Sequence, residues 1–284
     1  MSKKNAYAII HFGDNIKYIE LEIYLLLNLR KYTKLDIVYL YSINDTPIKY
    51  LKIFKLLCTH VIPYNDDGIT YNIKFNSYYN HFNTLRTCNI LFVNKLIEYN
   101  KVCVLESDLL ITKSIDDIFL LNTPSIILYS NIDIDKITKN IKYKMDKETI
   151  LKTCDEGTIT NGGVILIEPS LKVYNTMLVI IKDIINNKCK FPNETLFLLS
   201  YKYIYNLPIM YNFYHNLVKK YKWKEYLKDN KIYILHFSNT DFRPIRIIKD
   251  NYKIENIYKK NKILKVKKIY NKYIRIFDKL LYGI

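Results

Sequence analysis

The most constraining feature of the sequence is residues 101–105 (KVCVL), where every side chain after the first lysine is apolar. A strand with apolar side chains on both faces is typical of a parallel sheet covered by helices on both sides. Strand-like runs at 7–12, 35–41 and 59–62 alternate with helical patterns that follow Asp14 and Pro47. This order predicts an α/β fold with a Rossmann-like, mostly parallel central sheet flanked by helices.

The pattern is less regular in the rest of the chain. Residues 131–153 are polar, rich in lysine and weakly patterned, which indicates an insertion or lid over about 131–155. No linker or internal repeat is visible, so we predict a single domain over residues 1–250. Further strands are predicted at 125–129, 163–167 and 232–237, and helices at 83–99, at 170–186 with Ser170 as N-cap, and after a cap at Asn193.

Residues 251–284 form a basic tail, and from residue 262 onward its apolar side chains recur at helical spacing. An amphipathic helix of this kind packs on its own domain or on a second copy of the chain, as in a homodimer. A basic amphipathic helix also binds a membrane surface or another partner. The sequence leaves these alternatives open.

The chain has 284 residues and a formal net charge of +17, from 44 basic and 27 acidic side chains. Such a surplus favours polyanions, anionic membranes or phosphorylated ligands. Lysine is spread along the chain without a recognised nucleic-acid-binding motif, so we expect no specific nucleic-acid partner. A basic nucleic-acid-binding protein remains the third hypothesis for its function.

Five cysteines without a CxxC pair exclude a zinc or disulfide framework, and Cys58 and Cys103 are predicted to be small core residues. The N-terminus has only a short apolar run, which indicates a first strand and no signal peptide. No apolar stretch approaches the roughly 18 residues of a membrane span. We therefore expect no transmembrane segment and a cytoplasmic, intracellular location.

Two acidic residues, Glu106 and Asp108, follow the apolar strand directly. On an extended chain, side chains at i and i+2 point the same way, and two like charges there repel each other unless a cation joins them. Carboxylate oxygens suit Mg²⁺ or Mn²⁺, which also bind phosphate oxygens. The alternative is a solvated loop after a strand.

Two later segments carry polar residues at strand ends. Asn161-Gly162-Gly163 precedes an apolar strand, which lets the backbone approach a ligand and leaves an amide for sugar hydroxyls; the alternative is a simple turn. His236 closes the last apolar strand, and Arg243 follows it. A neutral imidazole binds metals and an arginine binds phosphate, although a histidine here is also a common structural residue.

Taken in order, these three segments resemble glycosyltransferase family 8, with the glycogenin branch as the nearest group. Smaller pieces add to the resemblance, which covers about residues 7–244: Tyr99-Asn100-Lys101, Ile115 to Phe119, Leu207-Pro208 and Tyr211-Asn212. The resemblance implies a GT-A fold, a UDP-sugar donor with Mn²⁺ (or Mg²⁺), and hexose transfer with retention, glucose being the expected sugar. The acceptor is a hydroxyl of a protein, a glycan or the chain itself.

The resemblance also implies roles for individual residues. Glu106 and Asp108 occupy the DxD positions and His236 the third metal-ligand position. Glu194 is the only carboxylate nominated near the donor sugar, and Arg243 would neutralise the leaving diphosphate, so these two are the candidate catalytic residues. The implied donor-binding residues are Ile10, His11, Phe12, Arg86, Glu106, Ser107, Asn161, Gly162, Asn193, Asn239 and Arg243.

Several positions depart from the family pattern, among them Ile16, which stands where glycogenin has a Tyr. Glu106 replaces the first Asp, and Asn193-Glu194 stands where the family has Asp-Gln. No strongly basic nucleophile is evident, so we favour front-side attack by the acceptor hydroxyl. The departures also permit an alternative from another class, a protein of the same fold that binds a nucleotide sugar without turnover.

Overall fold

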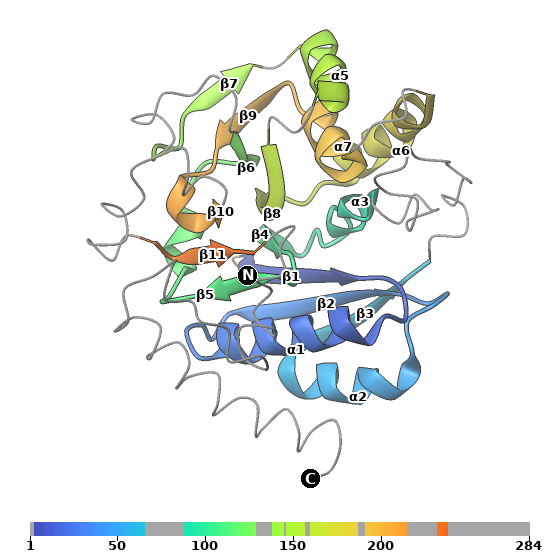
Figure 1. The fold of residues 1–284 in the computed structure, drawn as a ribbon, viewed down its shortest axis with the longest axis vertical. Helices are drawn as coiled ribbons and strands as arrows, with labels where there is room; N and C mark the ends of the chain where they lie inside the picture. The colour runs from blue at the N-terminus through green and yellow to red at the C-terminus, as the bar shows by residue number, and fades with distance from the viewer. Residues whose placement is uncertain are drawn as a thin grey trace.

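The computed structural model describes residues 3–65, 88–128, 138–144, 146–156, 160–186, 191–214 and 232–237. Its main feature is a mixed sheet of eight strands, which runs through the centre of Figure 1. The strands lie in the order β3 (His60–Tyr64), β2 (Asp36–Ser42), β1 (Lys4–His11), β4 (Tyr99–Leu105), β8 (Thr160–Ile167), β6 (Ser125–Leu128), β9 (Tyr203–Asn206) and β7 (Lys142–Lys144).

The predicted parallel arrangement holds for the first part of the sheet. Strands β3, β2, β1 and β4 pair in parallel, and so do β6 and β9. Strand β8 runs antiparallel to both of its neighbours, with Val164 opposite Leu105. The antiparallel direction matters for function because it places the beginning of β8 beside the carboxyl end of β4.

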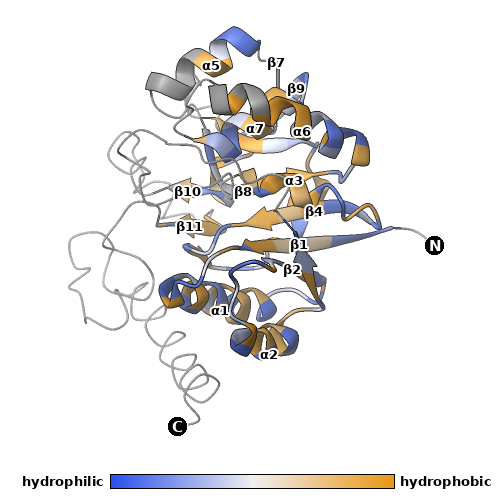
Figure 2. Cartoon of the chain, turned by 90° about the vertical axis from the view of Figure 1, so that its right-hand side faces the viewer, coloured by the Kyte–Doolittle hydropathy of each residue, from blue (hydrophilic) through white to orange (hydrophobic). Residues whose placement is uncertain are grey.

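Helices cover the sheet in two groups (Figure 1). Helices α1 (Ile16–Arg30) and α2 (Ile48–Leu57) lie against the parallel half, while α5 (Lys147–Glu156), α6 (Leu171–Asn186) and α7 (Pro192–Ser200) gather at the other half. Asn15 caps α1 by accepting a hydrogen bond from Lys17 N–H. In Figure 2 the central strands are mainly hydrophobic, and hydrophilic residues appear on the helices outside them.

Apolar side chains dominate the centre of the sheet, as the sequence pattern predicted. Val102 and Cys103 of β4 are completely buried, and Cys58 is 8% exposed. The predicted core positions of Cys58 and Cys103 are therefore confirmed. Burial raises the pKa of Cys58 to about 12 and also raises that of Cys103, so both thiols stay protonated and unreactive at neutral pH.

One predicted helix is wrong in the part that the structure describes. The pattern predicted a helix over residues 83–99, but among residues 88–99 only α3 (Ile90–Val93) is α-helical. The N–H of Asn94 donates to the carbonyl of Leu91 at 3.1 Å, an i−3 bond typical of a helix end. Tyr99 then starts β4 opposite Lys4 of β1, so sheet pairing overrides the helical spacing of the apolar residues.

The prediction that Asn193 caps a short helix is also wrong. Helix α7 begins at Pro192 with Phe191 as its N-cap residue. Proline suits the first helical position because its missing N–H and fixed φ cost nothing there. Asn193 lies in the first turn instead, and its Oδ1 accepts a hydrogen bond from Ile90 N–H at 3.1 Å. By contrast, the Ser170 cap is confirmed, because its Oγ accepts from Val173 N–H at 3.4 Å.

The segment predicted as an insertion contributes to the main sheet. Within 131–155, residues 131–137 and 145 lie outside the described residues, and the remainder includes β7 and most of α5. Strand β7 pairs antiparallel with β9, so polar residues with weak patterning form an edge strand, where side chains contact solvent. The tail at 251–284 lies outside the described residues.

A second, small sheet was not anticipated in full. It contains β10 (Phe213–Tyr214), β11 (Ile234–His236) and β5 (Leu109–Ile111), in that order. Strand β5 follows the acidic motif at once, and Ile111 N–H donates to Asn28 Oδ1 of α1 at 2.7 Å. This sheet brings the last described strand of the chain next to the acidic motif.

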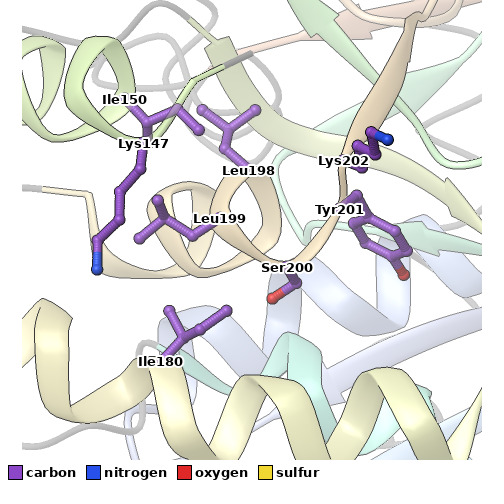
Figure 3. Close-up of a pocket in the computed structure, with 8 residues that line it drawn as sticks. All are labelled: Lys147, Ile150, Ile180, Leu198, Leu199, Ser200, Tyr201 and Lys202. Carbon is purple, nitrogen blue, oxygen red and sulfur yellow. The ribbon is translucent and has the colours of Figure 1, made fainter. Parts of the chain in front are cut away.

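A hollow of about 250 Å³ lies among α5, α6 and α7 (Figure 3). It contains none of the residues predicted for the functional site. Its lining residues are Lys147, Ile150, Ile180, Leu198, Leu199, Ser200, Tyr201 and Lys202. Within the described ranges, no helix combines the length and the apolar character that crossing a bilayer requires.

Candidate metal centre

The acidic motif and the late histidine meet at the carboxyl end of β4. Glu106 to Asp108 form the turn between β4 and β5, and β11 pairs antiparallel with β5 so that His236 lies opposite Leu109. Phe237 N–H also donates to the carbonyl of Asp108 at 3.1 Å. Backbone pairing therefore holds His236 beside Asp108, although the two are far apart in the sequence.

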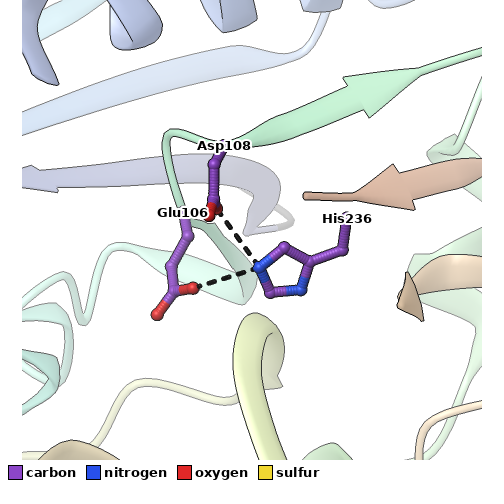
Figure 4. Close-up of side chains that lie close together, drawn as sticks. All are labelled: Glu106, Asp108 and His236. Atoms are coloured by element: carbon purple, nitrogen blue, oxygen red, sulfur yellow. Dashed lines mark ion pairs between the residues drawn. The ribbon is translucent and has the colours of Figure 1, made fainter. Parts of the chain in front are cut away.

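The three side chains that the sequence nominated as metal ligands converge (Figure 4). His236 Nε2 lies 3.2 Å from Asp108 Oδ1 and 3.6 Å from Glu106 Oε2. One ligand atom from each residue lies within 4.8 Å of the other two. The His236 ring is completely buried, the Asp108 side chain is 18% exposed, and that of Glu106 is 45% exposed. The cluster is thus closed on the histidine side and open at Glu106.

The charges in this cluster oppose one another. Loss of hydration within the site, followed by repulsion from Asp108, raises the pKa of Glu106 to about 8. Because solvent reaches nearly half of the Glu106 side chain, we give the repulsion more weight than the loss of hydration. Burial of the His236 ring disfavours its charged form, but Asp108, Glu106 and Glu194 together raise its pKa. A proton or a cation is needed to relieve this negative field.

The donor set fits a divalent cation. Two carboxylates and an imidazole nitrogen are ligands that suit Mn²⁺, and carboxylates alone suit Mg²⁺. The ligand atoms lie close enough together for one ion to contact all three residues. The arrangement can therefore hold a metal next to the strand end where α/β sheets bind their ligands.

The glycine-rich segment at the start of β8 leaves room for the histidine. A Cβ atom on Gly163 would lie 2.3 Å from Cε1 and 2.5 Å from Nδ1 of His236. The ring therefore occupies the space that any side chain at Gly163 would need. The sequence predicted that this segment lets the backbone approach a ligand, whereas in the structure the close neighbour of Gly163 is His236 itself.

Replacing Gly163 with alanine should displace the His236 ring and weaken Mn²⁺ binding by about 10- to 100-fold. The new methyl group would overlap the ring, and the ring is held in place by the buried amide of Asn212. Electron paramagnetic resonance of free Mn²⁺ measures the affinity directly.

The matched control is Gly162→Ala, whose Cβ would meet the flexible carboxylate of Glu194 at 3.2 Å. That variant should bind Mn²⁺ within about twofold of wild type, because the end of the Glu194 side chain can shift by a few tenths of an ångström and Glu194 is not one of the three ligands. Equal affinities of Gly163→Ala and wild type would show that the ring does not need this space.

The amide of Asn161 is partly engaged within the protein. Its Oδ1 accepts hydrogen bonds from Gly163 N–H at 2.9 Å and from Asn212 Nδ2 at 3.0 Å. The sequence pattern predicted a free amide facing sugar hydroxyls. That expectation is wrong for the oxygen atom, because the turn into β8 and the neighbouring asparagine use it.

Glu194, the nominated catalytic carboxylate, lies near the cluster in the first turn of α7. Its Oε1 accepts a hydrogen bond from Gly162 N–H at 3.3 Å. Burial raises the pKa of Glu194, and its charge contributes to the field at Glu106 and His236. Segments around residues 106, 162, 194 and 236 therefore face one volume, as the resemblance implied.

The residues predicted to border the nucleotide base lie at the end of β1 and in the loop after it. His11 is 1% exposed, and its ring faces inward. Its Nδ1 lies 2.9 Å from Glu22 Oε1 and its Nε2 lies 2.8 Å from the carbonyl oxygen of Gly13. Both ring nitrogens are engaged by the protein, so the contribution of His11 is to hold the β1–α1 loop in place.

The other predicted donor-binding residues divide into two groups. Ile10, Phe12, Ser107 and Asn193 are partly buried and belong to β1, the loop after it, the acidic turn and α7 respectively. Arg86, Asn239 and Arg243 lie outside the described residues. Donor binding by both groups stays a prediction.

Sequence reasoning missed two residues that shape the site. Asn212 accepts from the His236 ring, with 2.9 Å between Oδ1 and Nδ1, yet in the sequence it is only one of the smaller pieces of the family resemblance. Glu22 binds His11. It was missed because an acidic residue in a helix is usually expected on the solvent-exposed side. A carboxylate on the apolar face of a helix is the signal that could have identified Glu22.

Comparison with known proteins supports the fold. No protein-family model matches the chain. It is 27% identical over 250 residues to the uncharacterized protein R707 of Acanthamoeba polyphaga mimivirus, covering 83% of this chain and 80% of that protein. Among solved structures it resembles the galactosyltransferase LgtC, with a TM-score of 0.56 and 13% identity over 88% of this chain and 93% of LgtC.

Two further structures show the same similarity. The bifunctional glycosyltransferase WbbM matches with a TM-score of 0.54 and 15% identity, covering 94% of this chain and 52% of WbbM. The glycosyltransferase GlyE of Streptococcus pneumoniae TIGR4 matches with a TM-score of 0.52 and 17% identity, covering 86% of this chain and 56% of GlyE. The chain therefore spans about half the length of WbbM and GlyE. It has the GT-A glycosyltransferase fold, which confirms the predicted fold class.

Proposed function

We propose that the chain is a metal-dependent, retaining glycosyltransferase of family 8, similar to glycogenin. It transfers a hexose, with glucose as the expected sugar, from a UDP-sugar to a hydroxyl acceptor. The observation that carries this proposal is the convergence of Glu106, Asp108 and His236 within 4.8 Å at the end of β4 in a GT-A fold. Ligands bind at this edge in open α/β sheets.

Glu106, Asp108 and His236 would hold Mn²⁺ or Mg²⁺. When bound, the ion acts as a Lewis acid that stabilises the negative charge on the leaving diphosphate. Arg243, with Arg86, would donate charge-assisted hydrogen bonds to the same phosphate oxygens. The basic surplus of the chain, +17, favours the approach of such an anionic donor.

Glu194 would orient the donor sugar by accepting hydrogen bonds from its hydroxyl groups. Its carboxylate is held by Gly162 N–H, so it has a defined position beside the cluster. A carboxylate with a raised pKa is a weak nucleophile when protonated. We therefore favour front-side attack, in which the acceptor hydroxyl approaches the anomeric carbon on the face that the diphosphate leaves.

A panel of UDP-sugars incubated with the protein and Mn²⁺ tests the proposal. Release of UDP from one donor above the rate without protein is the expected result. Intact-mass measurement separates modification of the chain itself from transfer to an added acceptor or to water. If no donor in the panel is bound and none is hydrolysed, the proposal is contradicted.

The second candidate is a protein that binds a nucleotide sugar without turnover. The specific observation in its favour is Asn193, which stands in place of a family Asp and whose Oδ1 accepts from Ile90 N–H. A residue committed to a structural hydrogen bond is less free to position substrate. Tight binding of a UDP-sugar with Mn²⁺ and no release of UDP would favour this candidate.

Binding of the divalent cation should strengthen as the pH rises from about 6.5 to about 8.5. Repulsion from Asp108 raises the pKa of Glu106, so part of the Glu106 population carries a proton in the lower part of this range and the cation must displace it. Each displaced proton changes the affinity by up to about tenfold per pH unit. Calorimetry in two buffers of different ionisation enthalpy measures both the affinity and the protons released.

Glu106→Gln is the matched variant for this measurement, because glutamine has no proton to release. Its affinity should depend less steeply on pH than that of the wild type. A wild-type affinity that is constant over this range would show that Glu106 does not bind the cation.

A further inference from the structure

The buried ring of His236 is connected to the start of β8 by two asparagines. Asn212 Oδ1 lies 2.9 Å from His236 Nδ1, and Asn212 Nδ2 donates to Asn161 Oδ1 at 3.0 Å. Asn161 Oδ1 also accepts from Gly163 N–H at 2.9 Å. Asn212 and His236 are 0% and 1% exposed, so water does not compete for these contacts.

The chain of hydrogen bonds determines which way each amide faces. A backbone N–H can only donate, so the Asn161 atom next to Gly163 must be the oxygen. The Asn212 atom that faces this oxygen must then be its NH₂ group. The oxygen of Asn212 is left facing His236, and an amide oxygen can only accept. Nδ1 of His236 must therefore carry a proton.

This assignment decides what the other side of the ring presents. In a neutral imidazole only one nitrogen carries a proton, so a proton on Nδ1 leaves a lone pair on Nε2. Nε2 is the atom that faces Asp108 at 3.2 Å and Glu106 at 3.6 Å. Without a fixed partner on Nδ1, the neutral ring would move its proton to Nε2 and donate it to a carboxylate.

We propose that Asn212 is a positioning residue that holds neutral His236 in the Nδ1–H tautomer and so directs the Nε2 lone pair at the cation site. The proposal rests on the metal centre proposed above and goes beyond it. The orientation of the Asn212 amide depends on Asn161, which is two hydrogen bonds away from His236, and on the N–H of Gly163, which is three away. Partners of this kind typically change metal affinity by about 10- to 100-fold.

The backbone gives Asn212 a rigid support for this role. It follows the short 3-10 helix η4 (Ile209–Tyr211), and its N–H donates to the carbonyl of Ile209 at 3.1 Å. Tyr233 N–H donates to the carbonyl of Met210 at 2.8 Å, which connects this turn to the segment that carries β11. The two elements that carry Asn212 and His236 are therefore joined by a main-chain hydrogen bond.

The test compares Asn212→Leu with Asn212→Asp in the full chain. Leucine removes the acceptor, so Mn²⁺ affinity should fall about 10- to 100-fold. Aspartate keeps an oxygen that accepts from Nδ1–H but loses the NH₂ group that donates to Asn161 Oδ1, so the affinity should fall clearly less than in Asn212→Leu. Mn²⁺ affinity is measured by electron paramagnetic resonance without any sugar, which separates the result from turnover.

The ¹⁵N resonances of the His236 ring provide a second readout that a loss of stability would not reproduce. In metal-free protein, at a pH above the pKa of the ring, wild type and Asn212→Asp should show a protonated Nδ1 and an unprotonated Nε2. Asn212→Leu should show the proton on Nε2. An Asn212→Leu variant with the wild-type tautomer and wild-type Mn²⁺ affinity would overturn the proposal.

A matched control and a second route guard against a variant that does not fold. Asn206 is also 0% exposed, accepts from Leu128 N–H at 3.0 Å and donates to the carbonyl of Lys139 at 3.1 Å. Asn206→Leu should lose stability and keep the Mn²⁺ affinity of wild type.

If Asn212→Leu is unfolded, Asn161→Ala tests the same series of hydrogen bonds, because the Asn212 amide is then free to flip.

Asn161→Ala should lower Mn²⁺ affinity in the wild-type background and have no effect in the Asn212→Asp background, where a flipped carboxylate still presents oxygen. An equal loss in both backgrounds would overturn the positioning role. If the wild type binds no Mn²⁺, the metal centre itself fails, and the ¹⁵N resonances alone then decide the role of Asn212. The two failures are thus distinguishable.

Discussion

Replacing Asp108 with asparagine should lower the rate of UDP release by about three orders of magnitude, equivalent to about 4 kcal/mol of transition-state stabilisation. The asparagine keeps the shape of the side chain and removes its charge. The Asp108 side chain is 18% exposed, less than that of Glu106, and its Oδ1 lies closer to His236 Nε2, at 3.2 Å. Its charge is therefore the least screened by solvent.

The same geometry predicts an order among the three ligands. His236→Ala should lose about as much activity as Asp108→Asn, because the buried ring supplies the only neutral ligand of the cluster. Glu106→Gln should lose less, about 10- to 100-fold, because its side chain is 45% exposed and water can replace it as a ligand. Initial rates of UDP release and Mn²⁺ affinity measure both effects.

Two variants of the same residue types serve as controls. Asp146→Asn changes an exposed carboxylate that accepts from Thr149 N–H at 2.8 Å, and asparagine can make the same bond. His60→Ala removes a half-exposed ring on β3. Both controls should release UDP at the wild-type rate. Full activity in both Asp108→Asn and His236→Ala would refute the assignment of these ligands.

The second large effect concerns stability. Replacing His11 with leucine should lower the free energy of unfolding by about 3–5 kcal/mol, because it leaves the charge of Glu22 buried without its partner. The side chains of His11 and Glu22 are 1% and 5% exposed and lie 2.9 Å apart. Tyr39 also donates to Glu22 Oε2 at 2.7 Å, so both oxygens of this buried carboxylate have partners. Urea unfolding measures the loss.

A double-mutant cycle separates the ion pair from simple packing. In the Glu22→Leu background no buried charge remains, so His11→Leu should cost less than about 2 kcal/mol. His60→Leu, which removes an exposed histidine, should change stability by less than about 0.5 kcal/mol. A cost of His11→Leu that is the same in both backgrounds would show that the pair contributes no coupling.

The stabilisation by His11 should depend on pH in a defined direction. Burial of the ring opposes its charged form, but Glu22 and the carbonyl of Gly13 together raise its pKa above the ordinary value of about 6.5. A raised pKa in the folded state means that the ion pair contributes fully below about pH 6.5. This contribution disappears as the pH rises through the raised pKa. The difference between wild type and His11→Leu should therefore shrink at alkaline pH.

Local patterns in the sequence determined the fold class and much of the element order. The apolar run at 101–105 and the alternating strand and helix patterns before it predicted a covered, largely parallel sheet, and β1 to β4 form it. Such patterns succeed because burial on a strand or helix face repeats every two or about 3.6 residues. The strand-end positions of Glu106, Asp108 and His236 likewise followed from where apolar runs stop. The convergence of these residues was implied by the family resemblance.

Only the tertiary structure decided how those strand ends meet. The antiparallel pairing of β5 with β11 places His236 beside Asp108. The antiparallel pairing of β8 with β4 places Gly163 against the His236 ring. Contacts between distant segments leave no periodic trace in a single sequence, so neither Asn212 nor Glu22 could be assigned its partner beforehand. The predicted helix also ends too late for the same reason, since Tyr99 pairs with Lys4 of β1 and not with a helical turn.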